Sequence, residues 1–409
     1  MKLLLLLAWR NVWRNKRRSF ITLSAVAFAA LMAIAMRGIQ LGTYALNYKT
    51  IIETFPGYIQ IQKIGYKKNP SLNKAFVYSE NLETKLISMH GVTGSSPRIN
   101  ADGLVSFGDV SLGAAVFGII PEKEKNVSTI FEKLNEGNFF WYDSTNEIVV
   151  GYKLLANLDA KIGDEIVILS QGYDGSLGNM KYKISGTVKT GNTVFDAMAV
   201  FIGLKSAHQL LGMDTKVNTI AIKVSSLEKT NPVRNEIKSV INNPELVVLT
   251  WEEIMPELKQ SMEFDNVSGI FFLGILIIIV AFGILNTVLM SVTERFREFG
   301  VVLAIGMPQI NLVQVVYIET FFITLLGILI GNIAGYFVNY YIVLNPIILG
   351  GGLAEVYAEY NFVPRLESSL DVMIFLNVSI SIIVISIISC FYPAYKTYKL
   401  EPLKGIRHT

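Results

Sequence analysis

Glu319 is an acidic residue within a long apolar segment, a position that is unusual for a carboxylate. It is the only charged residue in the apolar run from Ile310 to Leu344. A carboxylate is costly to place in apolar surroundings, so such a residue has either a function or a charged partner. Glu319 could carry a proton or contact a substrate. Pairing with a nearby arginine is the favoured interpretation, because Glu319 lies close to one end of the run.

Motifs for catalysis or nucleotide binding are missing from the sequence. It contains no GxxxxGKS or GxxxxGKT phosphate loop, no HExxH, no GxSxG and no CxxC. The histidines are scattered at His90, His208 and His408, and the single cysteine, Cys390, lies in an apolar run. We therefore expect no catalysis, no cofactor and no metal in this chain. Nucleic-acid binding is not expected either, because the basic clusters flank apolar segments.

The elements that must position these residues are long apolar segments. Hydrophobic residues make up 51% of the chain and charged residues 17%, against about 25% charged in soluble domains. Four segments are long enough to cross a bilayer, which takes about 20 apolar residues. These transmembrane helices are predicted at 20–40, 267–292, 310–344 and 372–395. The shorter apolar run at 3–9 is not a signal peptide, because basic residues follow it.

The basic residues predict the orientation of these helices. Lysine and arginine gather before the first helix, in the link 293–309 and in the tail 396–409. By the positive-inside rule, these three segments are cytoplasmic, so both termini are inside. The large segment 41–266 and the loop 345–371 then lie outside. The sequence therefore predicts a multi-pass protein of the bacterial inner membrane with a large periplasmic domain.

The segment 1–19 is predicted to form a cytoplasmic amphipathic helix. Its basic residues share one side at helical spacing, namely Arg10, Arg14, Arg17 and Arg18. Trp9, Val12 and Trp13 fall on another side. Such a helix lies along an anionic membrane surface with its tryptophans at headgroup level. Membrane anchoring is the simplest interpretation.

The segment 41–266 is predicted to be an α+β domain with slightly more acids than bases. Alternating patterns predict strands at 58–64, 114–120, 147–150, 164–169, 182–188, 199–202, 218–224 and 246–250. Helices are predicted at 80–89, 206–211, 231–242 and 252–266. The residues 121–225 are a candidate subdomain. The complete fold class is an α-helical membrane protein with this domain inserted between its first two transmembrane helices.

Some apolar residues within the predicted transmembrane helices are candidates for contact with cargo. Those that could line an acyl-chain groove are Phe28, Met32, Met36, Phe271, Phe272 and Ile275, because flexible methionine and flat phenylalanine suit variable lipid chains. They could equally pack helices together or face lipid. Arg37, near the outer end of the first helix, is expected to reach the interface, with a place in a cargo cleft as the alternative. Gly327, Gly331 and Gly335 form a stripe that predicts close helix packing.

The link between the second and third transmembrane helices contains the most distinctive motif. From Ser291 to Ile310 it reads SVTERFREFGVVLAIGMPQI. The apolar residues after Glu298 predict a short amphipathic helix. Gly306 is placed to end that helix, and Pro308 to start the next segment. A short helix between two transmembrane helices could act as a lever, or it could be a plain connector at the membrane surface.

This link resembles the TERxxEFGxLxAIG signature of the MacB/FtsX-like permeases, a family that includes macrolide exporters and lipoprotein-releasing permeases. The start of the chain, LAWRNVWRNKRRSFITLSAVAFA, and its end, YPAYKTYKLEPLKGIR, resemble the corresponding ends of that family. The segments 97–98, 118–124, 147–169 and 195–213 are similar to the periplasmic core of these permeases. The last of them looks closer to the lipoprotein-releasing branch than to the macrolide branch.

The resemblance implies that 293–309 is a cytoplasmic coupling helix that contacts a separate ABC ATPase subunit. The residues implied in this coupling are Glu294, Arg297, Glu298, Phe299, Gly300, Ala304, Ile305 and Gly306. It further implies a dimer with a second permease copy or a homologue. The ATPase would bind ATP and Mg, and its closure would move the coupling helices and the external domains by mechanotransmission. The cargo would be a lipoprotein or another amphiphile, taken from the membrane and passed to a periplasmic acceptor.

Two other functions are compatible with the same resemblance. One is efflux of a macrolide or peptide, with a periplasmic adaptor that binds the external domain. The other is regulation of cell-wall hydrolases, as in the cell-division members of the family. The large size of 41–266 argues against this last function, because those members have a smaller external domain.

Overall fold

A computed structural model describes residues 2–14, 16–241, 243–359 and 362–401 of the chain. The chain forms two compact units. The helical unit comprises Met1–Tyr44, Met262–Ile348 and Arg365–Thr409, and the sheet unit comprises Ala45–Ser261 and Leu349–Pro364. Predictions that fall on 402–409, including the end of the tail, lie outside the described residues.

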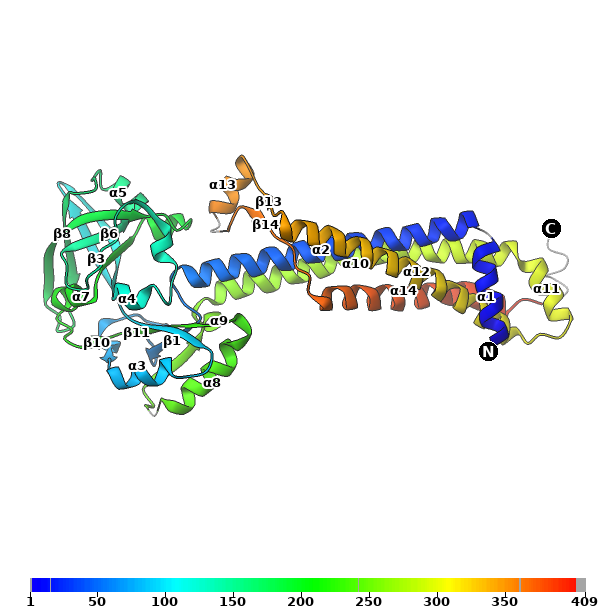
Figure 1. Cartoon of the computed structure of the whole chain (residues 1–409), viewed down its shortest axis with the longest axis horizontal. Helices are drawn as coiled ribbons and strands as arrows, with labels where there is room; N and C mark the ends of the chain where they lie inside the picture. The colour runs from blue at the N-terminus through cyan, green and yellow to red at the C-terminus, as the bar shows by residue number, and fades with distance from the viewer. Residues whose placement is uncertain (1, 15, 242, 360–361, 402–409) are drawn as a thin grey trace. The chain divides into compact units, whose positions relative to one another are not determined.

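Four long helices form the helical unit and run alongside one another (Figure 1). They are α2 (Lys16–Thr54), α10 (Pro256–Glu294), α12 (Gln309–Leu344) and α14 (Val372–Tyr398). Each is long and apolar enough to cross a membrane, so the predicted fold class with four transmembrane helices is confirmed. The remaining short elements of this unit are α1 (Lys2–Arg14), α11 (Phe296–Ala304), β13 (Ile347–Ile348) and β14 (Arg365–Leu366), whereas α13 (Gly352–Glu359) belongs to the sheet unit.

The glycine stripe on α12 packs against α2. A Cβ atom at Gly331 would lie 2.5 Å from the Cβ of Ala30, and one at Gly327 would lie 2.8 Å from the Cβ of Val26. At these distances only glycine lets the two helices approach so closely. The predicted role of the stripe in helix packing is confirmed.

Helix α1 packs on α12. Leu4 and Ala8 are buried and form a cluster with Val315 of α12. The ring of Trp9 lies edge to face with the ring of Phe322, with 5.5 Å between their centroids. The apolar side of α1 is therefore used, at least in part, for contact with another helix of the chain.

The predicted single helix over 1–19 is wrong in its extent. Helix α1 ends at Arg14 and α2 begins at Lys16, so Arg17 and Arg18 belong to α2. Asn15 lies outside the described residues. The basic residues are therefore divided between two helices instead of lining one face.

The sheet unit is built around a ten-stranded sheet with the order β12-β1-β11-β3-β4-β9-β6-β8-β5, and β7 pairs with β3 and β8. The strands of this sheet are β1 (Ile59–Lys63), β3 (Val92–Phe107), β4 (Val110–Ile119), β5 (Leu134–Gly137), β6 (Glu147–Gly151), β7 (Glu165–Gln171), β8 (Leu177–Val188), β9 (Ala199–Gly203), β11 (Thr219–Val224) and β12 (Leu246–Thr250). A separate pair is formed by β2 (Phe76–Val77) and β10 (Lys216–Val217). Every predicted strand overlaps one of these strands.

The sheet joins the candidate subdomain 121–225 to the rest of the unit. Strands β9, β6, β8 and β5, all from this range, lie together at one end of the strand order. Strand β11 instead lies between β1 and β3. All these strands belong to one compact unit, and the subdomain boundaries stay a prediction.

Short helices complete the sheet unit. They are α3 (Glu80–Ile87), α4 (Pro121–Glu124), α5 (Tyr152–Asn157), α6 (Thr193–Asp196), α7 (Leu204–Leu211), α8 (Thr230–Val240) and α9 (Trp251–Ile254), with single turns at Leu72–Lys74, Ile130–Lys133 and Leu227–Lys229. The predicted helix 231–242 corresponds to α8, and Asn242 lies outside the described residues.

The predicted helix 252–266 is two helices. Helix α9 begins with a capping box, in which Thr250 and Glu253 satisfy each other's backbone N–H groups. It ends at Met255, whose φ of −122° and ψ of 68° are not helical. Pro256 then starts α10. Proline lacks the N–H that an ongoing helix needs but suits the first position of a new one, which explains the break.

A buried ion pair lies in the core of the sheet unit. Arg98 of β3 lies 2.6 Å from Glu124 of α4, and their side chains are 2% and 0% exposed. The Oγ of Ser96 donates to the same carboxylate at 2.7 Å. The Arg98 guanidinium also lies over the ring of Phe55, 4.0 Å from its centroid. These contacts attach α4 to the centre of the sheet.

We expect the sheet unit to lose stability as the pH falls below about 6.5, the ordinary pKa of histidine. The Nε2 of His208 on α7 lies 3.0 Å from the carbonyl oxygen of Lys216, and burial lowers the pKa of His208. The unfolded chain then binds a proton more readily than the folded chain. The contribution of His208 is complete above the unfolded pKa and is lost as the pH falls through it. The protection factors of the α7 amides, which account for the slower intrinsic hydrogen exchange in acid, should therefore fall as the pH is lowered, and fall less in His208→Gln.

Candidate functional site

Helix α11 carries the central part of the predicted coupling segment 293–309. Arg295 turns the chain between α10 and α11, with φ −102° and ψ 9°. Gly306 follows the end of α11 with a φ of +105°, a conformation that favours glycine. Its N–H donates to the carbonyl oxygen of Leu303 at 3.0 Å, which satisfies one of the free carbonyls at the helix end. The local sequence therefore sets both limits of this short helix.

The inner side of α11 is fixed to the neighbouring helices by apolar contacts. Phe299 is 3% exposed and belongs to the same buried cluster as Val292 of α10 and Leu312 of α12. Gly300 is buried as well. Neither residue is on the surface of the described chain, and their predicted part in coupling to an ATPase subunit stays a prediction. Both hold α11 against the helical unit.

The opposite side of α11, termed here the outer face, is exposed and largely apolar. It is formed by Arg297, Val301, Ala304 and Ile305. The side chain of Ile305 is 82% exposed and that of Val301 is 45% exposed. Exposed apolar residues on one side of a connecting helix mark a surface for interaction with a protein or a membrane. Gly306 is exposed next to this face.

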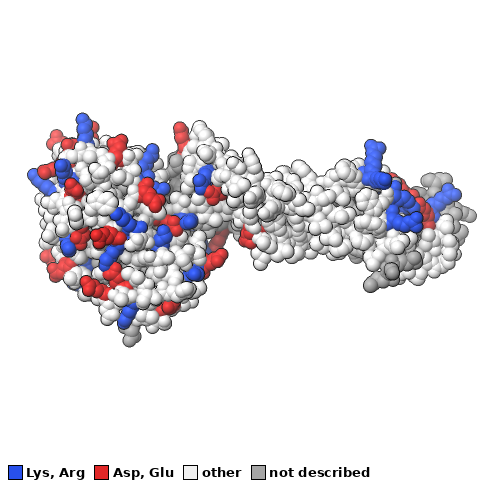
Figure 2. All heavy atoms as spheres, in the orientation of Figure 1, with Lys and Arg blue, Asp and Glu red and all other residues white. Residues whose placement is uncertain are grey.

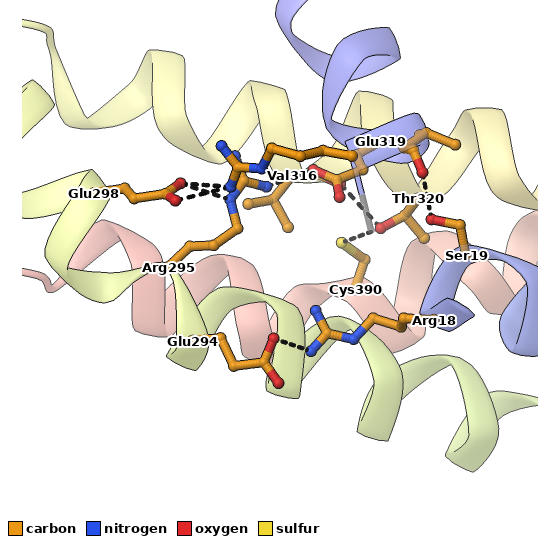
Figure 3. Close-up of polar contacts among 11 residues, drawn as sticks. Arg18, Ser19, Glu294, Arg295, Glu298, Val316, Glu319, Thr320 and Cys390 are labelled. Atoms are coloured by element: carbon orange, nitrogen blue, oxygen red, sulfur yellow. Dashed lines mark hydrogen bonds and ion pairs between the residues drawn. The ribbon is translucent and has the colours of Figure 1, made fainter. Parts of the chain in front are cut away.

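An ion-pair network connects α11 to two other helices. Arg14 of α1 donates two hydrogen bonds to the Glu298 carboxylate, at 2.7 and 2.9 Å. Arg295 donates to Glu298 at 3.3 Å through Nε and to Glu319 of α12 at 2.9 Å through Nη1. Figure 3 shows Arg295 between the two carboxylates. A movement of α11 would therefore be transmitted to α1 and α12.

The charge of Glu298 is stabilised by its partners. Partial burial acts to raise the pKa of Glu298, but the hydrogen bond and charge of Arg14, followed by those of Arg295, outweigh it. The pKa therefore lies below its ordinary value. Glu298 is ionised at neutral pH, and its links to Arg14 and Arg295 are charge-assisted.

The network includes Arg14, Arg18 and Arg295, for which the sequence predicts only membrane anchoring or orientation. Arg295 is the partner of Glu319, so the pairing interpretation of Glu319 is the one that the structure supports. Arg18 of α2 lies 2.6 Å from Glu294, also visible in Figure 3. One signal could have revealed Arg295, since it precedes Glu298 by three residues, a spacing at which side chains on a helix meet.

The residues proposed for an acyl-chain groove lie on the surface of the helical unit. The most exposed are Phe271 at 66%, Phe28 at 64% and Phe272 at 56%. Met36, Ile275 and Met32 are 43%, 42% and 39% exposed. None of the six belongs to the buried cluster that holds the long helices together. They are thus available to lipid, cargo or another chain, and their role in a groove stays a prediction.

Arg37 joins α2 to α10. Its Nη2 donates to the side-chain oxygen of Asn266 at 2.5 Å and its Nη1 to that of Gln40 at 2.8 Å. In this structure the guanidinium is therefore held by a neighbouring helix, and its predicted extension to the membrane interface stays a prediction. Among the described residues, no group of three or more His, Cys, Asp or Glu could hold a metal ion.

Two family models match the sequence. Residues 19–240 match the model described as MacB-like periplasmic core domain, which covers more than half of the chain. Residues 270–402 match the model described as FtsX-like permease C-terminal. The first match contains most of the sheet unit, and the second contains α11 together with Glu294, Arg295, Glu298 and Glu319 of the ion-pair network.

Related proteins show the same resemblance at low identity. The lipoprotein-releasing system transmembrane protein LolC of Xylella fastidiosa is 22% identical over 78% of this chain and 78% of its own length. The macrolide export ATP-binding/permease protein MacB 1 of Yersinia pestis is 21% identical over 98% of this chain and 60% of its own length. The crystal structure of the periplasmic region of MacB from Actinobacillus actinomycetemcomitans aligns with a TM-score of 0.37 and 13% identity, over 52% of this chain and 95% of that one.

Proposed function

Because the chain belongs to the family of permeases with a MacB-like periplasmic core domain and an FtsX-like C-terminal region, we propose that a separate ATPase subunit drives it as the membrane subunit of an ABC transporter. In this proposal the chain has no enzymatic activity of its own. ATP and Mg are bound by the ATPase. The termini and α11 are cytoplasmic, and the sheet unit is periplasmic.

The structure of α11 is the observation that carries this proposal. Its outer face exposes Val301 and Ile305, which suits docking to another protein. Its inner side is fixed by Phe299 and by the pairs of Glu298. A force on the outer face would therefore be passed to α1, α10 and α12 rather than absorbed by a flexible loop. Coupling of ATP hydrolysis to movement of the chain requires such a transfer of force from one helix to the others.

The proposed cargo is a lipoprotein or another amphiphile extracted from the inner membrane. The relative named for lipoprotein release supports this class of cargo, as do the exposed apolar side chains on α2 and α10. The chain would act as a dimer with a second copy or a homologue and pass its cargo to a periplasmic acceptor. Efflux with a periplasmic adaptor is the second candidate, supported by the match to a macrolide export protein over nearly the whole chain.

The test is to purify the tagged chain from detergent-solubilised membranes and identify the copurifying proteins by mass spectrometry. We expect an ABC ATPase together with lipoproteins. An ATPase with a periplasmic adaptor and an outer-membrane channel would favour efflux, and one with a cell-wall hydrolase would favour a regulatory function. Absence of any ATPase from cross-linked and uncross-linked samples would refute the proposal.

We expect Glu298→Lys to uncouple ATP hydrolysis from transport. The new lysine would face Arg14 and Arg295, so repulsion would replace two attractive contacts. The effect on stability should be small, about 1 kcal/mol or less, because the Arg14–Glu298 pair is half exposed. ATPase activity and cargo release, measured on the same proteoliposomes, report the two functions separately.

The charge-swapped variant Glu298→Lys with Arg14→Glu is the control, because it restores an ion pair between α1 and α11. It should recover part of the cargo release. Equal release by wild type and Glu298→Lys would contradict the assigned role of this pair. Gly300→Trp is a less informative variant, because Gly300 is buried and a bulky side chain there would disturb the fold.

A further inference from the structure

A cationic cleft lies where the first turns of α2 meet the last turns of α10. Its volume is about 690 Å³. It is lined by Arg14, Lys16, Arg17, Arg18, Ile21, Asn286, Thr287, Met290 and Glu294. Four of these side chains are positive and only one is negative. In Figure 2, the basic residues at this end of the helical unit stand out from the uncharged flank of its long helices.

The positive charge in this cleft is not neutralised by the chain itself. Arg14 pairs with Glu298, and one nitrogen of Arg18, Nη2, pairs with Glu294. The other nitrogen, Nη1 of Arg18, is buried without a hydrogen-bond partner. Among the described residues, Lys16 and Arg17 have no ion pair. The unpaired charges of Lys16 and Arg17 therefore favour an anion with several oxygen atoms.

Apolar side chains lie directly beside these charges. Ile21 of α2 and Met290 of α10 both line the cleft, and they are 58% and 57% exposed. Asn286 and Thr287 also line the cleft, about one helical turn further from Glu294 along α10 than Met290. The cleft therefore places cations next to apolar and neutral polar side chains of two transmembrane helices.

We propose that this cleft is a binding site for one anionic phospholipid. The headgroup phosphate would accept hydrogen bonds from Lys16 and Arg17. The acyl chains would begin at Ile21 and Met290 and continue along α2 and α10, with Asn286 and Thr287 beside them. Phosphate is the anion that suits such a set of donors, since it can accept hydrogen bonds from several cations at once.

A bound lipid would also act on the ion pairs of the helical unit. The phosphate would compete with Glu294 for Arg18, which joins α2 to α10. Lipid binding would thus alter the contact between these two helices at the end where α11 begins. The binding site itself does not depend on the proposed transport function, because it is defined by residues of this chain alone.

Native mass spectrometry of the purified full chain in detergent tests the proposal. The protein is freed of lipid and titrated with phosphatidylglycerol or phosphatidylcholine that have the same acyl chains. We expect one phosphatidylglycerol to bind per chain, much more tightly than phosphatidylcholine. The double variant Lys16→Gln/Arg17→Gln should bind it roughly 30-fold more weakly, since each cation near an anionic headgroup contributes about 1 kcal/mol.

The variant Lys396→Gln/Lys399→Gln is a matched control. It also removes two basic residues, Lys396 of α14 and Lys399 at the C-terminal cap of that helix. Neither lines the cleft, so this variant should bind the lipid like wild type. Equal loss in both variants, or none in the Lys16/Arg17 variant, would overturn the proposal. Inorganic phosphate is added as a competitor. Displacement of the lipid by millimolar phosphate would identify a free-phosphate site instead of a lipid site, and no displacement is the expected result.

Discussion

Glu319→Ala should lower the stability of the helical unit by about 3 kcal/mol. The Glu319 carboxylate lies 2.9 Å from Nη1 of Arg295, and the two side chains are only 14% and 11% exposed. Removing one partner of a buried ion pair leaves the other charge without compensation, which typically costs 3–5 kcal/mol. We expect the lower end of this range, because Arg295 keeps its contact with Glu298. Thermal unfolding in detergent, followed for wild type and variant, measures the difference.

Two further variants separate the loss of the ion pair from other effects of the substitution. Replacing both partners, as in Arg295→Met/Glu319→Leu, should recover much of the lost stability, because no buried charge is left unpaired. Glu294→Ala removes an acid that is 46% exposed and pairs with Arg18, so its cost should stay within about 1 kcal/mol. A double variant as unstable as Glu319→Ala would show that Glu319 matters for another reason.

Ile305→Glu should abolish binding of the proposed ATPase subunit without unfolding the chain. Ile305 is 82% exposed, so the folded chain alone tolerates a charge there. Burial of an isoleucine side chain in an interface contributes about 2–3 kcal/mol, and a buried unpaired carboxylate would add a further cost. Together these predict an affinity at least about 100-fold weaker. Copurification of the ATPase and stimulation of its activity are the measurements.

Ile348→Glu is the matched control for this prediction. Ile348 is 80% exposed and follows the far end of α12, so the same substitution there should leave ATPase binding unchanged. Thermal unfolding should be the same for both variants and wild type. If Ile305→Glu retained the ATPase at wild-type level, the outer face of α11 would not be the docking surface.

The apolar segments could be predicted from the sequence because the bilayer imposes a length and a composition on them. The glycine stripe on α12 was equally predictable, since its spacing follows directly from helix geometry. The ends of the helices were harder to predict from the sequence. Helix α2 begins at Lys16, although the apolar pattern starts at Phe20. Charged residues continue a helix without contributing to the pattern that reveals it.

Strand β3 shows why part of the sheet unit could not be predicted. It runs from Val92 to Phe107 and contains Gly94, Pro97, Asn100 and Gly103, all of which are disfavoured in strands. Its conformation is set by its neighbours, because β11, β4 and β7 all pair with it. Such pairings join residues far apart in the sequence. They therefore cannot be predicted from a local sequence pattern.

The candidate site combines predictable and unpredictable parts in the same way. The motif around Glu298 predicted a short helix, and Gly306 was placed correctly at its end. Which side of α11 faces inward could not be predicted, because Phe299 and Ile305 are both large and apolar. The partner of Glu319 depends on how α12 packs beside the turn at Arg295, and this is a property of the tertiary structure.

The pairing of β1 has a consequence for the time course of folding during synthesis. Ile59 lies opposite Ile222 of β11 and opposite Thr250 of β12. This edge of the sheet therefore cannot close until the ribosome has passed residue 250, when α2 has long been made. Contacts between such distant residues form slowly, because a large loop must be ordered first. Until then, β1 has an unpaired edge, and a nascent chain that pauses before β12 would be a target for chaperones and proteases.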